Sequence, residues 1–268
     1  MTSRDDGSKH QGLAGRAVFL SGASRGIGRA IALRFAREGA DLFLVATNAS
    51  LLATTAEDAR DLGARVETSV VDVADREQCR AAVAKAEAAL GRLDSLVSCA
   101  SVYHAAPFLG CAPEDYQRLL DVNLFGSIHL MQSVLPGMLD RAYGRIVVIA
   151  STAGRSASPN RSAYSVSKHA LVGLTRCVAV ETADKGITVN ALCPGPVRTD
   201  MLEELIHRRA EIEHTSTEAV RTAMRNKVGM KRFLESDEIA SLALYLASEE
   251  SAAMTGQALV LDGGILFP

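Results

Sequence analysis

Tyr164 and Lys168 are the residues of this sequence whose spacing most directly suggests chemistry. They stand four positions apart in Y-S-V-S-K, inside a stretch whose pattern predicts a helix, so both side chains lie on one helical face. An ammonium group beside a phenol favours the phenolate and lowers a tyrosine pKa that is ordinarily about 10. A tyrosine tuned in this way can exchange a proton with a carbonyl oxygen near neutral pH. The pair predicts proton transfer, with an ordinary pair of helix residues as the alternative.

Residues 21–28, S-G-A-S-R-G-I-G, allow two interpretations. Residues 22–26 match G-x-S-x-G, the pattern that presents a hydrolase serine on a sharp turn. Alternatively, Gly22, Gly26 and Gly28 let a phosphate approach the start of a helix. A hydrolase needs a histidine after a late strand, and none of the six histidines lies beyond residue 214. The phosphate-binding interpretation is therefore preferred.

Two polar residues are expected near the Tyr164–Lys168 pair. Ser151 ends an apolar run that predicts a strand, so its hydroxyl emerges at the carboxyl edge of the sheet, where ligands bind. Asn123 interrupts a stretch from about 114 to 139 that reads as one long helix, and asparagine is a modest helix former. Asn123 is therefore a candidate for a functional role, with a structural role as the alternative.

The elements that must position these residues alternate between strand and helix along nearly the whole chain. Apolar runs of strand length lie at 17–21, 41–46, 65–71, 93–98, 144–151, 187–192 and 258–263. Helical patterns separate them, as at 28–39 and 75–91. The alternation predicts an α/β fold, a doubly wound and mostly parallel seven-stranded sheet with helices on both faces. We expect one domain over 14–268, after a disordered tail over 1–13.

Residues 200–231 depart from this alternation, because they read as two helices where a loop should join two elements. An insertion on the carboxyl side of such a sheet lies over the ligand crevice. We therefore predict a small helical lid over the substrate, with a merely solvated helix pair as the alternative.

Composition argues against several classes of protein. The net charge of −2, from 29 basic and 31 acidic residues, gives no field that would attract nucleic acid or a membrane surface. No apolar run approaches the roughly 20 residues that span a bilayer, and the polar N-terminus is not a signal peptide. The five scattered cysteines fit neither a disulfide framework nor a metal site. We predict a cytoplasmic protein without a metal.

Together these motifs resemble the short-chain dehydrogenase/reductase family over about residues 14–264. The glycine loop, Asp72-Val73, Asn123, Ser151, Tyr164 and Lys168 follow in the family's order, and the runs at 194–199 and 261–264 resemble its later loops. The resemblance implies a Rossmann-type fold and an oxidoreductase that moves a hydride between a nicotinamide cofactor and a carbonyl or secondary alcohol.

The resemblance also implies a role for each matching residue. Tyr164 would be the general acid, or the base in the reverse direction, and Lys168 would lower its pKa and hold the nicotinamide ribose. Ser151 would orient the substrate carbonyl, and Asn123 would anchor a water that relays protons to Lys168. The residues implied in cofactor binding are Gly22, Ser24, Arg25, Gly26, Ile27, Gly28, Thr47, Asp72, Val73, Ala100, Tyr164, Lys168, Pro194, Gly195, Val197 and Thr199.

One stretch departs from the family's pattern. Residues 98–101 read Ser-Cys-Ala-Ser where the family usually has Asn-Asn-Ala-Gly. Ser101 is expected to place a side chain where glycine leaves room beside the cofactor, which affects the pocket and not the fold.

The end of the second predicted strand bears on the choice of cofactor. Residues 45–48, Val-Ala-Thr-Asn, contain no acid to bind the adenosine ribose and repel a 2′-phosphate. Arg25 in the glycine loop can pair with that phosphate. We therefore predict NADP(H) over NAD(H), although position 47 lacks the arginine that many NADP-dependent relatives carry.

For the substrate, the pattern is most similar to reductases of 3-oxoacyl thioesters. Tyr103, His104 and Phe108 are predicted to border the pocket. An NAD-dependent dehydrogenase of a cyclic or other secondary alcohol is the alternative, and a catalytically silent nucleotide-binding sensor is an alternative of another class. Basic residues in and near 200–231 could bind a phosphopantetheine arm or an acyl-carrier protein, unless they form a solvated face: Arg208, Arg209, Arg221, Arg225, Lys231 and Arg232.

The helix that carries Tyr164 is apolar on more than one face and therefore needs a second burial partner. Since relatives usually form tetramers through this helix and its predecessor, we predict a homotetramer. The residues in question are Ala163, Val166, Ala170, Leu174, Val178 and Val180.

Overall fold

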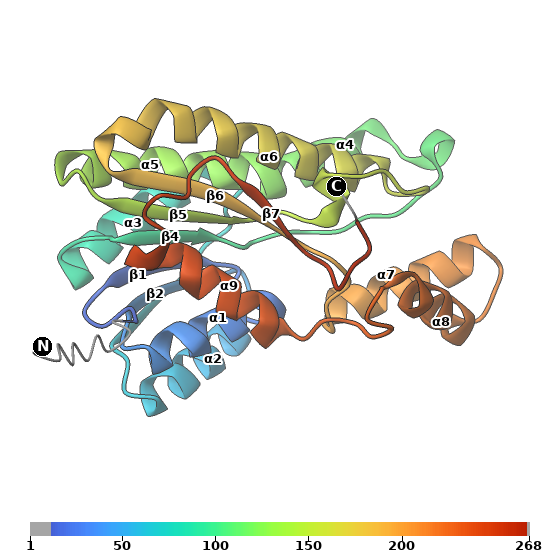
Figure 1. Ribbon diagram of the computed structural model, residues 1–268, viewed down its shortest axis with the longest axis horizontal. Helices are drawn as coiled ribbons and strands as arrows, with labels where there is room; N and C mark the ends of the chain where they lie inside the picture. Colours follow the sequence, from blue (N-terminus) through green and yellow to red (C-terminus); the bar gives the residue numbers. More distant parts are fainter. Residues whose placement is uncertain (1–11, 267–268) are drawn as a thin grey trace, which may run out of the picture.

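A single seven-stranded parallel sheet runs through the computed structural model, which describes residues 12–266 (Figure 1). The strand order is β3-β2-β1-β4-β5-β6-β7, so the chain turns back between β1 and β4. The strands are β1 Ala17–Ser21, β2 Asp41–Ala46, β3 Val66–Val70, β4 Ser95–Ser98, β5 Gly144–Ile149, β6 Ile187–Pro194 and β7 Ala258–Leu261. In a sheet of this kind, ligands bind outside the carboxyl ends of the strands near that turning point.

Helices cover both faces of the sheet (Figure 1). One layer contains α1 Gly26–Arg37, α2 Ala49–Asp61 and α9 Ser236–Ala247, and the other contains α3 Arg76–Leu90, α5 Gly126–Asp140 and α6 Ser162–Thr182. Every residue of β1 is buried, because its successive side chains enter opposite layers: Val18 and Leu20 pack in one core and Phe19 in the other. The predicted fold class is confirmed.

The stretch that reads as one long helix is divided in the structure. α4 Pro113–Leu120 leads into a π-helical turn, Asp121–Phe125, which continues as α5. Such turns add a residue to one helical turn and often occur at functional sites. Asn123 lies inside this turn and is fully buried.

Two further helices lie beyond the carboxyl edge of the sheet, α7 Asp200–Ile212 and α8 Thr217–Lys227 (Figure 1). The Thr199 and Ser216 side chains cap their first turns. The two helices pack together through a small apolar cluster of their own, which includes Leu202, Ile206 and Val220. The two predicted helices are therefore present, and their action as a lid remains a prediction.

The disordered tail predicted over residues 1–13 extends too far toward the domain. Leu13 is 1% exposed and packs in the core beneath α1 and α9, so the chain is already anchored there. Residues 1–11 of the predicted tail lie outside the described residues. Between residues 12 and 266, no helix combines the length and the apolar character that a membrane crossing requires.

Candidate functional site

Tyr164 and Lys168 lie on one face of α6, as their spacing predicts. The Lys168 ammonium nitrogen is 5.6 Å from the centroid of the Tyr164 ring, and the two residues are 1% and 8% exposed. Lys168 Nζ donates a hydrogen bond of 3.1 Å to the carbonyl of Ile149 at the end of β5. Ser151 follows two residues later and lines, together with Tyr164, a cavity of about 260 Å³. The structure thus brings these three side chains to one place.

Burial sets the protonation of both α6 residues. Desolvation raises the pKa of Tyr164 above its ordinary value, while the Ser151 hydroxyl and the charge of Arg161 lower it by less. The sequence predicted a lowered pKa caused by Lys168, and the structure shows a net rise because the phenol is removed from water. Desolvation also lowers the pKa of Lys168 from 10.5 to about 8. At neutral pH Tyr164 is a phenol and Lys168 is mostly an ammonium ion.

The Asn123 side chain holds the loop that follows β4. Its amide oxygen accepts hydrogen bonds from the Val102 backbone at 2.8 Å and from the Ser101 hydroxyl at 3.1 Å. Its amide nitrogen donates to the Val102 carbonyl and to the Ser167 hydroxyl, both at 3.0 Å. These bonds occupy the Asn123 side chain, and its backbone carbonyl accepts from the Ser127 hydroxyl at 3.3 Å, so the predicted water contact remains a prediction.

The same bonds explain the departure at residues 98–101. Ser101 turns its hydroxyl toward Asn123 and does not line the cavity. The Ser21 hydroxyl accepts hydrogen bonds from the Cys99 and Ala100 backbones at 3.1 and 3.3 Å. Ser101 therefore braces the loop, and its effect on the room beside a cofactor remains a prediction.

The glycine loop fits a bound dinucleotide. A Cβ atom on Gly22 would lie 2.7 Å from the Ala100 nitrogen, and one on Gly28 would lie 2.1 Å from the Gly22 oxygen, so neither position accepts a side chain. α1 begins at Gly26 without a side-chain cap and without an acidic residue in its first turn. Its N–H groups and positive end are therefore available to a pyrophosphate.

The hydrolase interpretation finds no support in the structure. No histidine or carboxylate of the described chain forms a hydrogen bond with the Ser24 hydroxyl. A serine nucleophile requires such a partner.

The other predicted cofactor residues gather at the carboxyl edge, because all strands are parallel. Thr47 follows β2 and is exposed, as is Asp72 after β3, whereas Val73 is buried. A Cβ atom on Gly26 would lie 3.2 Å from the Thr199 methyl group, so the loop after β6 faces the glycine loop. Ile27, Pro194, Gly195, Val197 and Thr199 line the same cavity as Tyr164.

Arg25, which was predicted to bind the cofactor's 2′-phosphate, forms an ion pair with a carboxylate in this structure. Its guanidinium lies 3.4 Å from the carboxylate of Asp200 in the first turn of α7, and both side chains are largely exposed. Exposed pairs of this kind contribute little stability, so the contact can yield to a phosphate.

The pocket-bordering predictions are met in part. Tyr103 lines the cavity and packs edge-on against Tyr164, with ring centroids 5.0 Å apart, and burial raises its pKa to about 12. Phe108 is 72% exposed and lines neither pocket described here, which corrects the prediction. Sequence reasoning missed Arg161, which lines the cavity three residues before Tyr164. A spacing of three residues is nearly one helical turn, so it could have indicated that Arg161 lies on the same side of the helix as Tyr164.

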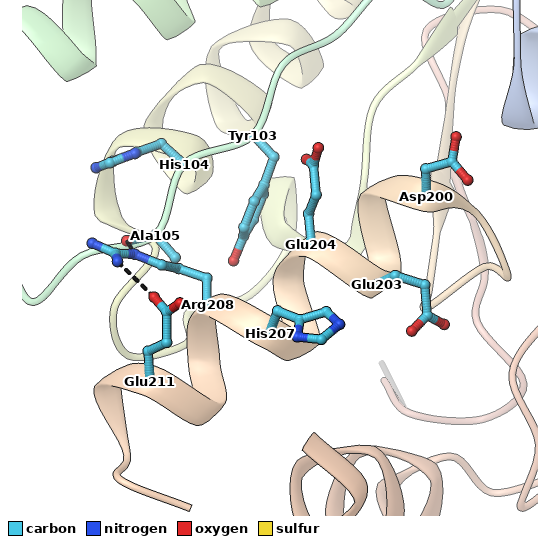
Figure 2. Close-up of a pocket in the computed structure, with 9 residues that line it drawn as sticks. All are labelled: Tyr103, His104, Ala105, Asp200, Glu203, Glu204, His207, Arg208 and Glu211. Atoms are coloured by element: carbon cyan, nitrogen blue, oxygen red, sulfur yellow. Dashed lines mark hydrogen bonds and ion pairs between the residues drawn. The ribbon is translucent and has the colours of Figure 1, made fainter. Parts of the chain in front are cut away.

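A second pocket of about 470 Å³ lies on the other side of Tyr103. Figure 2 shows Tyr103 between the chain segment of His104 and Ala105 and the helix α7. The helix contributes mainly charged side chains to this pocket: Asp200, Glu203, Glu204, His207, Arg208 and Glu211. His104 therefore borders this second pocket and not the cavity beside Tyr164.

Comparison with known proteins agrees with this geometry. Residues 22–266 match the family model described as enoyl-(acyl carrier protein) reductase. Oxidoreductase UcpA of Salmonella typhimurium is 39% identical over 257 residues, covering 96% of both chains.

Two solved structures share the whole fold. Actinorhodin polyketide ketoreductase with NADPH is 34% identical with a TM-score of 0.90, covering 93% of this chain and 97% of its own. NAD⁺-bound xylitol dehydrogenase is 31% identical with a TM-score of 0.92, covering 94% of this chain and 99% of its own. The chain belongs to the short-chain dehydrogenase/reductase family, oxidoreductases that act on CH–OH groups.

Proposed function

We propose that this protein is an NADP(H)-dependent reductase of ketones, with 3-oxoacyl thioesters and similar ketones as first candidates. The observation that carries the proposal is the buried Tyr164 phenol, which shares one cavity with Ser151 and with the loop after β6. When bound, the nicotinamide cofactor supplies the hydride in reduction and accepts it in oxidation.

Tyr164 gives its proton to the substrate oxygen in this proposal. A phenol whose pKa is raised by burial remains protonated at neutral pH and is ready to donate. Ser151 lies beside it and orients the carbonyl by donating a second hydrogen bond. Tyr164 is buried and Ser151 is partly buried, and hydrogen bonds from donors removed from water are stronger than in solvent.

Lys168 stabilises the anion that Tyr164 becomes. Its ammonium group is fixed by the Ile149 carbonyl and stays near the phenol, so it lowers the cost of the phenolate once the proton has left. We assign to the same group the contact with the ribose hydroxyls. Asn123 fixes the loop that follows β4, and we assign to it the anchoring of the relay water.

The preference for NADP(H) rests on two features. β2 ends in Ala46, followed by Thr47 and Asn48, so no carboxylate repels a 2′-phosphate there. Arg25 is exposed within the glycine loop, and Asp200 is the one ion-pair partner it has among the described residues. NADPH in the actinorhodin ketoreductase agrees with this choice, whereas NAD⁺ in xylitol dehydrogenase supports the second candidate, an NAD-dependent dehydrogenase of a secondary alcohol.

The absorbance of reduced nicotinamide tests this proposal directly. NADPH and NADH are each offered with 3-oxoacyl thioesters, cyclic ketones and the corresponding alcohols with oxidised cofactor. We expect ketone-dependent oxidation of NADPH and a loss of the preference for NADPH over NADH in Arg25→Ala. Equal preference in the variant and the wild type would refute the role of Arg25. Cofactor binding without turnover of any compound would favour the silent sensor.

The folded structure weakens the expectation of a carrier-protein partner. Four of the basic residues named for that role are paired with neighbouring glutamates: Arg208–Glu211, Arg209–Glu213, Arg221–Glu203 and Arg232–Glu238. Arg225 and Lys231 remain without a carboxylate partner in the described chain. We propose a substrate that is free in solution as the first candidate and keep an acyl-carrier-protein substrate as the second, since a 33% identical relative is a 3-oxoacyl-[acyl-carrier-protein] reductase.

Assembly as a homotetramer is also proposed. On α6, Val166 is 47% exposed and Val180 is 82% exposed, although the opposite face of the helix is buried against the sheet. Exposed valines on a helix that already has one buried face fit a second burial partner. Sedimentation of a tetramer is the expected result, and a monomer would contradict it.

A further inference from the structure

The cavity beside Tyr164 is lined without a single carboxylate among the residues that the structure describes. Its charged lining residues are all cations, namely Arg161, Arg209 and Lys227. This is unusual for a protein whose acidic residues outnumber its basic ones by 31 to 29. The interior of the cavity therefore favours an anion.

The three cations differ in their partners. Arg209 is paired with Glu213 at 2.6 Å, and Lys227 is exposed at the rim of the cavity on α8. Arg161 is half-buried, and its guanidinium has no hydrogen-bond or ion-pair partner within residues 12–266. A guanidinium partly removed from water without a partner is costly, so a ligand that supplies one is stabilised.

Arg161 belongs to the substrate side of the cavity. It stands at the start of α6, in the segment that connects Ser151 to Tyr164. It lines the same cavity as Tyr103 and Tyr164, and its positive charge opposes the rise that burial causes in the pKa of both phenols. The phosphates of a dinucleotide would lie at residues 22–28 instead, in the loop between β1 and α1.

We infer that Arg161 binds a carboxylate of the substrate, and that the protein prefers oxo acids over the corresponding neutral ketones. This inference rests on the proposed function and redirects its substrate class: among ketones it favours free oxo acids over 3-oxoacyl thioesters, in which the carboxyl group carries no charge. A planar guanidinium matches a carboxylate with two parallel hydrogen bonds, which a neutral ester cannot reproduce. Arg161 would thereby fix the substrate so that its ketone lies against Tyr164.

The test compares 2-, 3- and 4-oxo acids of four to eight carbons with their ethyl esters, at saturating cofactor. We expect the wild type to show a kcat/KM at least about tenfold higher for its best oxo acid than for the ester of that acid. Arg161→Gln should reduce this acid-to-ester ratio by about 10- to 100-fold, mainly through KM. Arg161→Lys should retain a preference for the acid, since it keeps the charge.

Arg37→Gln is the matched control, because it removes another arginine that has no partner among residues 12–266, from the last turn of α1 at the opposite edge of the sheet. It should leave the ratio unchanged, and thermal unfolding of both glutamine variants checks that they fold. Equal kcat/KM for acids and esters in the wild type, or an unchanged ratio in Arg161→Gln, would overturn the inference while the proposed function stands. If no ketone of either kind is reduced, the proposed function fails and the inference fails with it.

Discussion

Two pockets meet at Tyr103, and their charges are opposite. The charged residues of the cavity beside Tyr164 are all cations, whereas the pocket in Figure 2 is lined by four carboxylates together with Arg208 and His207. Helix α7 contributes side chains to the lining of both pockets. The apolar Met201, Leu202 and Leu205 of α7 face the cavity, while Glu203 and Glu204 face the other pocket.

The difference shows that the rotation of a helix about its axis determines which charged side chains face a reaction centre. Residues on α7 that are three or four positions apart share a face, so a rotation of about one residue would turn a carboxylate toward the cavity. As folded, the helix keeps negative charge out of the cavity and retains it on the solvent side. The consequence is that substitutions in the two pockets should differ strongly in their effect on turnover.

The largest effect is expected at the phenol. Tyr164→Phe removes the proton donor and leaves the ring, so kcat should fall by about 10²- to 10⁴-fold. Cofactor binding, measured by fluorescence of the reduced nicotinamide, should weaken by less than about tenfold. Retention of wild-type turnover would remove Tyr164 from the proton transfer and break the contrast between the pockets.

Lys168→Met should come second for activity, with a fall in kcat of about 100-fold, because the phenolate loses its neighbouring cation. The same variant should be more stable than the wild type in the absence of cofactor. Burial lowers the pKa of Lys168 from 10.5 to about 8, a change that corresponds to about 3 kcal/mol at most. The lost hydrogen bond to Ile149 offsets part of that gain.

The stability difference has a defined pH dependence. Below pH 8 Lys168 is charged in both the folded and the unfolded chain, and the full cost of burying the charge is present. Between about pH 8 and 10.5 the folded chain binds fewer protons than the unfolded one, so the wild type gains stability as pH rises. The advantage of Lys168→Met should therefore shrink over that range in urea unfolding, and a constant advantage would contradict the lowered pKa.

Tyr103 forms the wall between the pockets, so its removal should have an intermediate effect. Tyr103→Ala eliminates the ring that packs against Tyr164, and we expect kcat/KM to fall about tenfold as Tyr164 loses its support. Tyr103→Phe is the matched control. In the part of the chain that the structure describes, the Tyr103 hydroxyl has no hydrogen-bond partner, so this variant should stay within about twofold of wild type. Similar losses in both variants would point to the hydroxyl instead of the ring.

The smallest effect is expected in the acidic pocket. Glu204 is exposed and forms no ion pair with any described residue, so Glu204→Gln should change kcat/KM by less than about twofold for neutral and anionic ketones alike. A change of tenfold or more would mean that the substrate occupies this pocket as well, and the contrast between the two sites would fail.

The sequence by itself determined the reaction type and the fold class, whereas the order of the strands in the sheet came from the structure. Alternating apolar runs and helical patterns predict a doubly wound sheet, because each pattern reflects local periodicity. Gly22 and Gly28 predict the dinucleotide loop, and the four-residue spacing predicts that Tyr164 and Lys168 share a face.

Only the tertiary structure decided the electrostatics of the site. The raised pKa of Tyr164 depends on how many distant segments exclude water from it, and the bonds of Asn123 depend on the loop after β4. In sequence, the arginines and glutamates of 200–232 form one mixed run, but folding pairs most of them. Arg161 lies outside that run and has no side-chain partner in the part of the chain that the structure describes. Spacing along the chain fixes which residues face the same way, whereas burial and pairing depend on residues far apart in sequence.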